Sequence, residues 1–366
     1  MPLSRCLIPV KNNPVYLNII IMKNINTEVF YRRKDVEKLQ NRLIEIYKRK
    51  TPPSPEEYLP VLDKIHTVLQ NENKKLRPYG KSGLPGGILY LKQNIPTFIV
   101  PDIHARIDFF LKIMLHRDRG GISNLQKLAN HSLQIVCVGD GFHAEGRAAQ
   151  RWALAYEEYL KKYKKHRYID EEMRESLGVM EMVKEVKSSF PLNFHFLKGN
   201  HENISNEHGY GNYSFRKYAY EGAMVVYYIK KFYGKDFLNS YYHFEKSLPL
   251  LAVGKNFLIS HSEPLTFYHR EDLIEYRDRP EVVTGLTWTA NDDAENGSVN
   301  RMLDYYLLDE ENIEESYYFG GHRPVKGLYH LRAKGRYVQI HNPNKSIIAT
   351  IKEDKPIDLD EDIIEI

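Results

Sequence analysis

Cysteine is scarce in this chain of 366 residues, which contains two, Cys6 and Cys137. Two cysteines cannot build a disulfide framework, so the chain is not a small cross-linked secreted domain. Long apolar runs are also missing, which argues against a membrane span, and the short apolar patch at residues 17–22 is no signal-peptide core. We therefore expect a soluble cytoplasmic protein with no membrane partner.

A strong excess of charge of either sign is absent too. The chain has 52 basic and 48 acidic residues and a formal net charge of +4. This balance permits nucleic-acid binding without requiring it, so nucleic acid is not an expected partner. The length suits one large domain or two ordinary ones with a sizeable core.

Helical spacing of apolar residues marks the first part of the chain. It predicts one helix over residues 27–49 and a second over 54–71, with Ser54 as its N-cap. A long charged helical region over 144–187 is expected to break near residues 168–170. We interpret its basic run as a solvated helix face. Further helices are expected at 105–117, 213–232 and 300–313, and hairpins at 246–260 and 336–351.

These patterns predict three parts of the chain. Residues 1–80 form an N-terminal helical extension, residues 81–351 form a catalytic domain with a helical insertion at about 145–190, and residues 352–366 form a loose acidic tail.

Five short apolar runs each stop at polar residues that can bind metal. The runs are expected strands, and buried strands end at the edge of a sheet, so residues far apart in sequence can meet there. A lone histidine at such a place is more often structural, but the ordered set favours a site. The runs cover residues 97–101, 133–138, 194–198, 257–260 and 317–320, and the residues that follow them are Asp102, His104, Asp140, Asn200, His201, His261 and His322.

Hard oxygen atoms and imidazoles make up this set, with no thiolate. Such ligands suit two divalent ions, with manganese expected first and iron, zinc or magnesium as alternatives. Asp140 follows Gly139 at a strand end and is the natural bridge between the ions. Two ions about 3.5–4 Å apart would clamp phosphate oxygens and activate a water, leaving His201 as general acid.

Five motifs resemble those of the calcineurin-like metallophosphoesterases, and within them the phosphoprotein (serine/threonine) phosphatase family. The motifs lie in order between about residues 80 and 350. They read VPDIHA, VGDGFHAEGR, KGNHE, SHSE and GGHRP, where the family has GDxHG, GDxVDRG, GNHE, HGG and GHT. The resemblance implies an α/β fold, a four-layer α-β-β-α metallophosphatase sandwich with two mixed sheets.

The resemblance also implies roles and an activity. Phosphomonoesters, most typically phosphoserine and phosphothreonine in proteins, would be hydrolysed by direct attack of a metal-activated water, with a phosphorylated protein or a small phosphomonoester as partner. Asp102, His104 and Asp140 would bind one ion, Asp140, Asn200, His261 and His322 the other, and His201 would be the acid.

One motif departs from the family. His143 and Ala144 occupy the positions of an aspartate that orients the acid histidine and an arginine that grips phosphate. We expect Glu145 to orient His201 and Arg147 to reach the phosphate.

A second guanidinium is expected from Arg277 or Arg279, ahead of Trp288, because arginine pairs with phosphate through two hydrogen bonds. A surface ion pair is the alternative for each arginine.

Several alternatives stay open. The chain could be a nucleotide or dinucleotide phosphatase, a phosphodiesterase, or a metal-binding relative without turnover, and the sequence does not indicate an oligomeric state. His143 is ambiguous because it follows Asp140 by three residues. The histidines expected to be structural or at the surface are His66, His116, His131, His166, His195, His208, His243, His269, His330 and His341.

Overall fold

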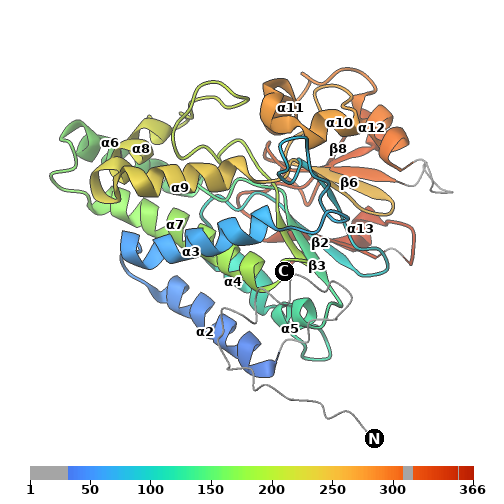
Figure 1. The fold of residues 1–366 in the computed structure, drawn as a ribbon, viewed down its shortest axis with the longest axis horizontal. Helices are drawn as coiled ribbons and strands as arrows, with labels where there is room; N and C mark the ends of the chain where they lie inside the picture. The colour runs from blue at the N-terminus through green and yellow to red at the C-terminus, as the bar shows by residue number, and fades with distance from the viewer. Residues whose placement is uncertain (1–31, 308–315, 353) are drawn as a thin grey trace, which may run out of the picture.

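The computed structural model describes residues 32–307, 316–352 and 354–366. The expected start of the first helix, at 27–31, and the end of the helix predicted at 300–313 lie outside these residues. The described strands form two mixed sheets, with helices beside both of them (Figure 1).

The first sheet is five-stranded and has the order β11-β10-β2-β3-β4. Its β2, β3 and β4 run parallel, and β10 is antiparallel to both of its neighbours. The parallel strands therefore end at one edge of the sheet. The bounds are β2 (Thr97–Val100), β3 (Gln134–Cys137), β4 (Phe194–Phe196), β10 (Ile347–Ile351) and β11 (Ile363–Glu365).

The second sheet is six-stranded and has the order β1-β5-β6-β7-β9-β8. Here β6, β7 and β9 run parallel, while β5 and β8 are antiparallel to β6 and β9. The antiparallel β5 and β6 confirm the hairpin predicted at 246–260. The bounds are β1 (Ile88–Tyr90), β5 (Leu251–Val253), β6 (Phe257–Ser260), β7 (Tyr317–Gly320), β8 (His330–Arg332) and β9 (Tyr337–Gln339).

Alternating side chains of each strand fill two different cores. Along β2, Phe98 and Val100 join the core shared with the helices, whereas Ile99 joins the core between the two sheets. Along β6, Ile259 faces the same inner core and Leu258 faces the helices beyond. Both faces of each sheet are covered, which explains why the strands read as unbroken apolar runs.

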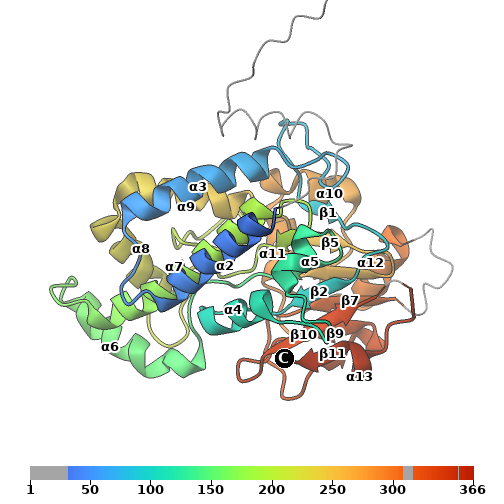
Figure 2. The same ribbon diagram turned by 90° about the horizontal axis from the view of Figure 1, so that it is seen from below.

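Helices form the two outer layers. Those from α2 to α9 pack together on the side of the five-stranded sheet, with α6 and α8 farthest from it, and α10 to α12 cover the six-stranded sheet (Figures 1 and 2). The predicted four-layer α-β-β-α sandwich is confirmed. The bounds are α2 (Arg33–Lys48), α3 (Pro55–Gln70), α4 (Ile107–Leu115), α5 (Asn124–Ala129), α6 (Ala149–Leu160), α7 (Arg167–Ser189), α8 (Glu221–Phe232), α9 (Gly234–Lys246), α10 (Arg270–Ile274), α11 (Pro280–Thr287), α12 (Ser298–Tyr306) and α13 (Leu359–Asp362).

None of the described helices has the length and apolar character needed to cross a membrane.

The two N-terminal helices pack on the long helix α7. Arg42 and Arg49 both donate at 2.6 Å to the buried carboxylate of Glu181 on α7. The cap predicted at the start of α3 is confirmed, since Ser54 and Glu57 form a reciprocal capping box. The predicted boundary near residue 80 stays a prediction.

Two helix predictions need correction. The basic run at 161–167 lies almost wholly in the turn between α6 and α7, because Lys162 and Tyr163 adopt left-handed backbone angles that end α6. It is therefore not a helix face, and the break falls before residues 168–170. The helix predicted at 213–232 begins only at Glu221.

The hairpin predicted at 336–351 is wrong. Its first strand, β9, pairs with β7 and β8 in the six-stranded sheet, while its second, β10, pairs with β2 and β11 in the other. The turn signal at Asn342 and Pro343 instead marks the point where the chain crosses between sheets.

The loose tail predicted at 352–366 is also wrong. Ile363 pairs with Ala349, so β11 extends the five-stranded sheet, and the Ile363 side chain is fully buried. Before it, Asp358 caps the short helix α13 through the backbone N–H groups of Asp360 and Glu361. The acidic residues lie among apolar ones that reach the core.

Candidate metal centre

The facing edges of the two sheets bring the predicted ligands together. β2 and β3 deliver Asp102, His104 and Asp140, and the loop after β4 delivers Asn200 and His201. From the other sheet, β6 delivers His261 and β7 delivers His322. Asp102, His104, Asp140, Asn200, His201 and His261 are all buried.

One group of ligand atoms surrounds the amide oxygen of Asn200. His261 Nε2 and His322 Nδ1 each lie 2.9 Å from Asn200 Oδ1. His261 Nε2 also lies 3.3 Å from Asp140 Oδ2. Ligand atoms about 2.1 Å from a shared ion lie roughly 3–3.5 Å apart, so this group has suitable spacing.

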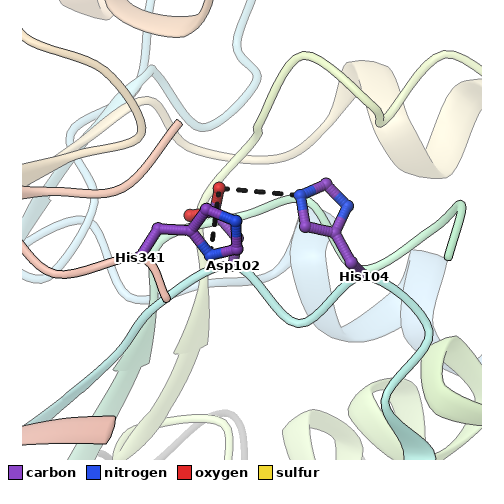
Figure 3. A group of neighbouring side chains, drawn as sticks. All are labelled: Asp102, His104 and His341. Carbon is purple, nitrogen blue, oxygen red and sulfur yellow. Dashed lines mark ion pairs between the residues drawn. The ribbon is translucent and has the colours of Figure 1, made fainter. Parts of the chain in front are cut away.

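A second group surrounds the carboxylates of Asp102 and Asp140. His104 Nε2 lies 3.7 Å from Oδ2 of each of them. His341 Nδ1 lies 3.8 Å from the same oxygen, Asp102 Oδ2 (Figure 3). Three buried sets have the spacing needed to hold an ion: Asp102 with His104 and His341, Asp102 with Asp140 and His261, and His104 with Asp140 and His201.

Glycine allows the two strand ends to approach each other. A Cβ at Gly139, whose φ is +113°, would collide with the backbone of Gly199, and one at Gly199 would collide with the Asp140 carboxylate. Glu202 then fixes the contact by accepting backbone N–H groups of Asp140, Gly141 and Gly199 at 2.7–2.9 Å. The glutamate of the KGNHE motif therefore holds the loops after β3 and β4 together through hydrogen bonds to their backbone.

Three of the ligand candidates have unusual backbone angles. His104, Asp140 and His322 adopt φ values of 45°, 51° and 63°. A side chain in this left-handed region carries strain, which is commonly found at functional sites.

Opposite charges accumulate around Asp140. Burial alone would raise the pKa of this carboxyl, but the His261 and His201 imidazoles hold it well below its ordinary value. Burial disfavours protonation of His261, yet the Asp140 carboxylate raises its pKa to about 9. Because a metal-bound imidazole is neutral, binding of an ion at His261 would release a proton.

His201 lies against two aromatic rings. Its ring centroid is 3.9 Å from that of Phe215, and its Nδ1 lies 3.2 Å from Nδ1 of His143. The prediction that Glu145 orients His201 is wrong, because Glu145 instead contacts His341 Nε2 and Lys217 Nζ, at 2.9 Å and 2.8 Å. The histidine at the motif's aspartate position makes the contact with His201.

The three arginines predicted to bind substrate all contact other groups of the chain. Arg147 donates to Ala105 O and pairs with Glu175, and Arg277 donates to Pro85 O. Arg279 lies 3.6 Å and 3.8 Å from carboxylates on α10 and α11. None of these partners is a ligand candidate, so the phosphate-binding role stays a prediction.

Two residues at the site, His341 and Lys217, were not predicted from the sequence to lie there. His341 follows the end of β9 by two residues, the same strand-end placement as the other ligands, and this signal could have found it. Lys217 comes from the loop before α8, and no local pattern indicated that it reaches Glu145.

The two-sheet sandwich is shared with solved phosphatase structures. The chain is similar to a protein serine/threonine phosphatase from Saccharomyces cerevisiae that resembles human phosphatase PP5. The two share a TM-score of 0.56 and 14% identity, over 92% of this chain and 95% of that one. The resemblance in fold is confirmed, and at this identity the activity has to be argued from the site.

Weaker likenesses exist to a cold-active protein tyrosine phosphatase, with a TM-score of 0.45, 11% identity and coverage of 72% of this chain and 76% of that one. A putative diadenosine tetraphosphatase has a TM-score of 0.37 and 14% identity over 77% of this chain and 97% of that one. No protein-family model and no curated protein matches the sequence.

Proposed function

We propose that the protein is a metal-dependent phosphatase that hydrolyses phosphomonoesters. The observation that carries this proposal is the meeting of carboxylate, imidazole and amide ligands from both sheets at one buried place. These are the ligands preferred by manganese, iron, zinc and magnesium, and we expect manganese first.

Six residues would hold two ions, with Asp140 between them. Asp102, His104 and Asp140 form one set, and Asp140, Asn200, His261 and His322 form the other. When bound, the ions would supply Lewis acidity toward phosphate oxygens and a nucleophilic water. The residues fit them because buried carboxylate oxygens and imidazole nitrogens converge with the spacing that a shared ion requires, and the Asn200 amide oxygen lies 2.9 Å from both His261 Nε2 and His322 Nδ1.

His201 would donate the proton to the leaving oxygen. Its Nε2 faces Asp140 Oδ2 at 3.8 Å, while Phe215 and His143 fix the ring from the other side. Burial lowers the pKa of His201 well below its ordinary value, and Asp140 only partly opposes this. A bound phosphate dianion would raise that pKa, because a neighbouring anion favours the charged imidazolium.

Phosphoserine and phosphothreonine in proteins are the substrates we propose. The fold shared with a protein serine/threonine phosphatase supports this choice. Lys217, about two-fifths exposed beside Glu145, offers a cation that an incoming phosphate would meet. The scarcity of cysteine supports a cytoplasmic location.

The test is hydrolysis of p-nitrophenyl phosphate by chelator-stripped protein with Mn²⁺ added back. Restored turnover, absent in Asp140→Asn, would support the proposal, and phosphopeptides and nucleotides would then be compared. Faster hydrolysis of bis-p-nitrophenyl phosphate would indicate a phosphodiesterase. Two bound ions without turnover would indicate a non-catalytic relative.

A further inference from the structure

His341 lies inside the metal centre although the motifs do not include it. It comes two residues after β9, beside β7, which delivers His322. Its side chain is fully buried, and its ring centroid is 5.2 Å from that of His104. In Figure 3 the His341 and His104 rings both approach the carboxylate of Asp102.

The two ring nitrogens of His341 have different surroundings. Nε2 lies 2.9 Å from Glu145 Oε2. Nδ1 lies 3.8 Å from Asp102 Oδ2 and, within the part of the chain that the structure describes, has no hydrogen-bond partner. A buried nitrogen without a partner is costly unless something else satisfies it.

Glu145 fixes the orientation of the ring. With Oε2 on His341 and Oε1 on Lys217 Nζ, at 2.8 Å, the carboxylate is held from both sides. When Glu145 accepts the Nε2 proton of a neutral ring, Nδ1 presents a lone pair toward Asp102, as a metal ligand must. A carboxylate behind a histidine is the usual support of a metal-binding imidazole.

We propose that His341 is a ligand of the ion held by Asp102, His104 and Asp140, binding through Nδ1, and that Glu145 and Lys217 orient it. This inference rests on the proposed function of the site as a metal centre. It gives this ion four protein ligands, drawn from both sheets. It also makes Glu145 a positioning residue that acts through His341.

A structural role for His341 is the rival explanation. A protonated ring between Asp102 and Glu145 would hold the two carboxylates together without binding metal. The two explanations differ in whether ion affinity depends on Nδ1, so the test measures affinity directly.

The experiment titrates chelator-stripped protein with Mn²⁺ and counts free ions by electron paramagnetic resonance. In His341→Ala, one of the two ions should bind more than ~100-fold more weakly, beyond the ~10–100-fold typical of an outer hydrogen-bond partner. Glu145→Gln should fall within that smaller range. His330→Ala, on the exposed strand β8, is the control and should match wild type.

Two further variants separate the ring nitrogens. The amide of His341→Asn lies near the place of Nδ1, and that of His341→Gln near the place of Nε2, so Asn should retain more affinity than Gln. If His341→Ala binds two ions with wild-type affinity, His341 is not a ligand, although the proposed function still stands. If the wild-type protein binds no ion, both the proposed function and the inference about His341 fail.

Discussion

Among single residues, the contact between His143 and His201 sets this site apart from the motif it resembles. Burial, with His104 nearby, lowers the pKa of His143 to about 3, so both rings are neutral near neutral pH. With Nδ1 atoms 3.2 Å apart, one ring donates and the other accepts. To act as an acid, His201 must first become the imidazolium beside a bound phosphate. Its Nδ1–H then donates to Nδ1 of His143, and its Nε2–H is the proton for the leaving oxygen.

Replacement of His201 tests its proposed role as the general acid. We expect His201→Ala to lower turnover of p-nitrophenyl phosphate by a factor of roughly 10²–10⁴, because protonation of the leaving oxygen is lost. Mn²⁺ content should stay at the wild-type level, which metal analysis would check. A variant with unchanged turnover would remove His201 from the mechanism.

A buried carboxylate remote from the ions controls acid stability. Burial would raise the pKa of Glu72, but Lys187 and Arg77, at 2.6 Å and 2.7 Å, lower it to about 2. A depressed pKa stabilises the folded state above the unfolded value of 4.5, and this contribution is lost as the pH falls toward 2.

The measurable result is a pH-dependent difference in the free energy of unfolding. Glu72→Gln should be less stable than wild type at neutral pH in urea titrations, and the difference should shrink as the pH falls below 4.5. Glu37→Gln, in an exposed pair with Arg33, serves as control and should change little. A difference that grows in acid would contradict the assignment.

Most of the residues that meet at the candidate metal centre could be named from the sequence because each follows a local signal. An apolar run that stops at Asp102, Asp140 or His261 is visible within a few residues. The partners of Glu145 were not predictable in this way, since His341 lies in the other sheet and Lys217 in an irregular loop. Contacts between distant segments depend on topology, which local patterns do not contain.

At the scale of strands, two predictions were wrong, the hairpin at 336–351 and the loose tail at 352–366. The segments at 336–340 and 346–351 do carry strand patterns, and β9 and β10 are strands. Their assignment to different sheets depends on which partner buries each of them best. The tail was misjudged because its many acidic residues outweighed the apolar spacing of Ile357, Leu359 and Ile363.

Neighbouring residues of β11 offer a matched test of the folded tail. Ile363→Ala should cost about 2–5 kcal/mol, because a fully buried side chain leaves a cavity. Ile364→Ala, at a position 39% exposed, should cost much less. Urea unfolding would measure both, and equal small effects would indicate that β11 is not bound to the sheet.

For the molecule as a whole, the proposed ions would join the two sheets. Asp102, Asp140 and Asn200 extend from one sheet, and His261, His322 and His341 from the other. Mn²⁺ at about 100 times its Kd should stabilise the fold by roughly 2.7 kcal/mol for each independent site, seen as a rise in Tm. Asp140→Asn should show a much smaller rise, and a wild-type Tm insensitive to Mn²⁺ would contradict the linkage.

The separation of the ligands along the chain also has a consequence for synthesis. Asp102 and Asp140 leave the ribosome long before the strands that carry His322 and His341 have been made. Until then Asp102 and Asn200 lack the contacts of His341 and His322, and the inner faces of β2 and β3 lack most of their covering sheet. We therefore expect the nascent chain to expose the inner faces of these strands until the second sheet forms, and the proposed ions to bind only after the late strands have docked.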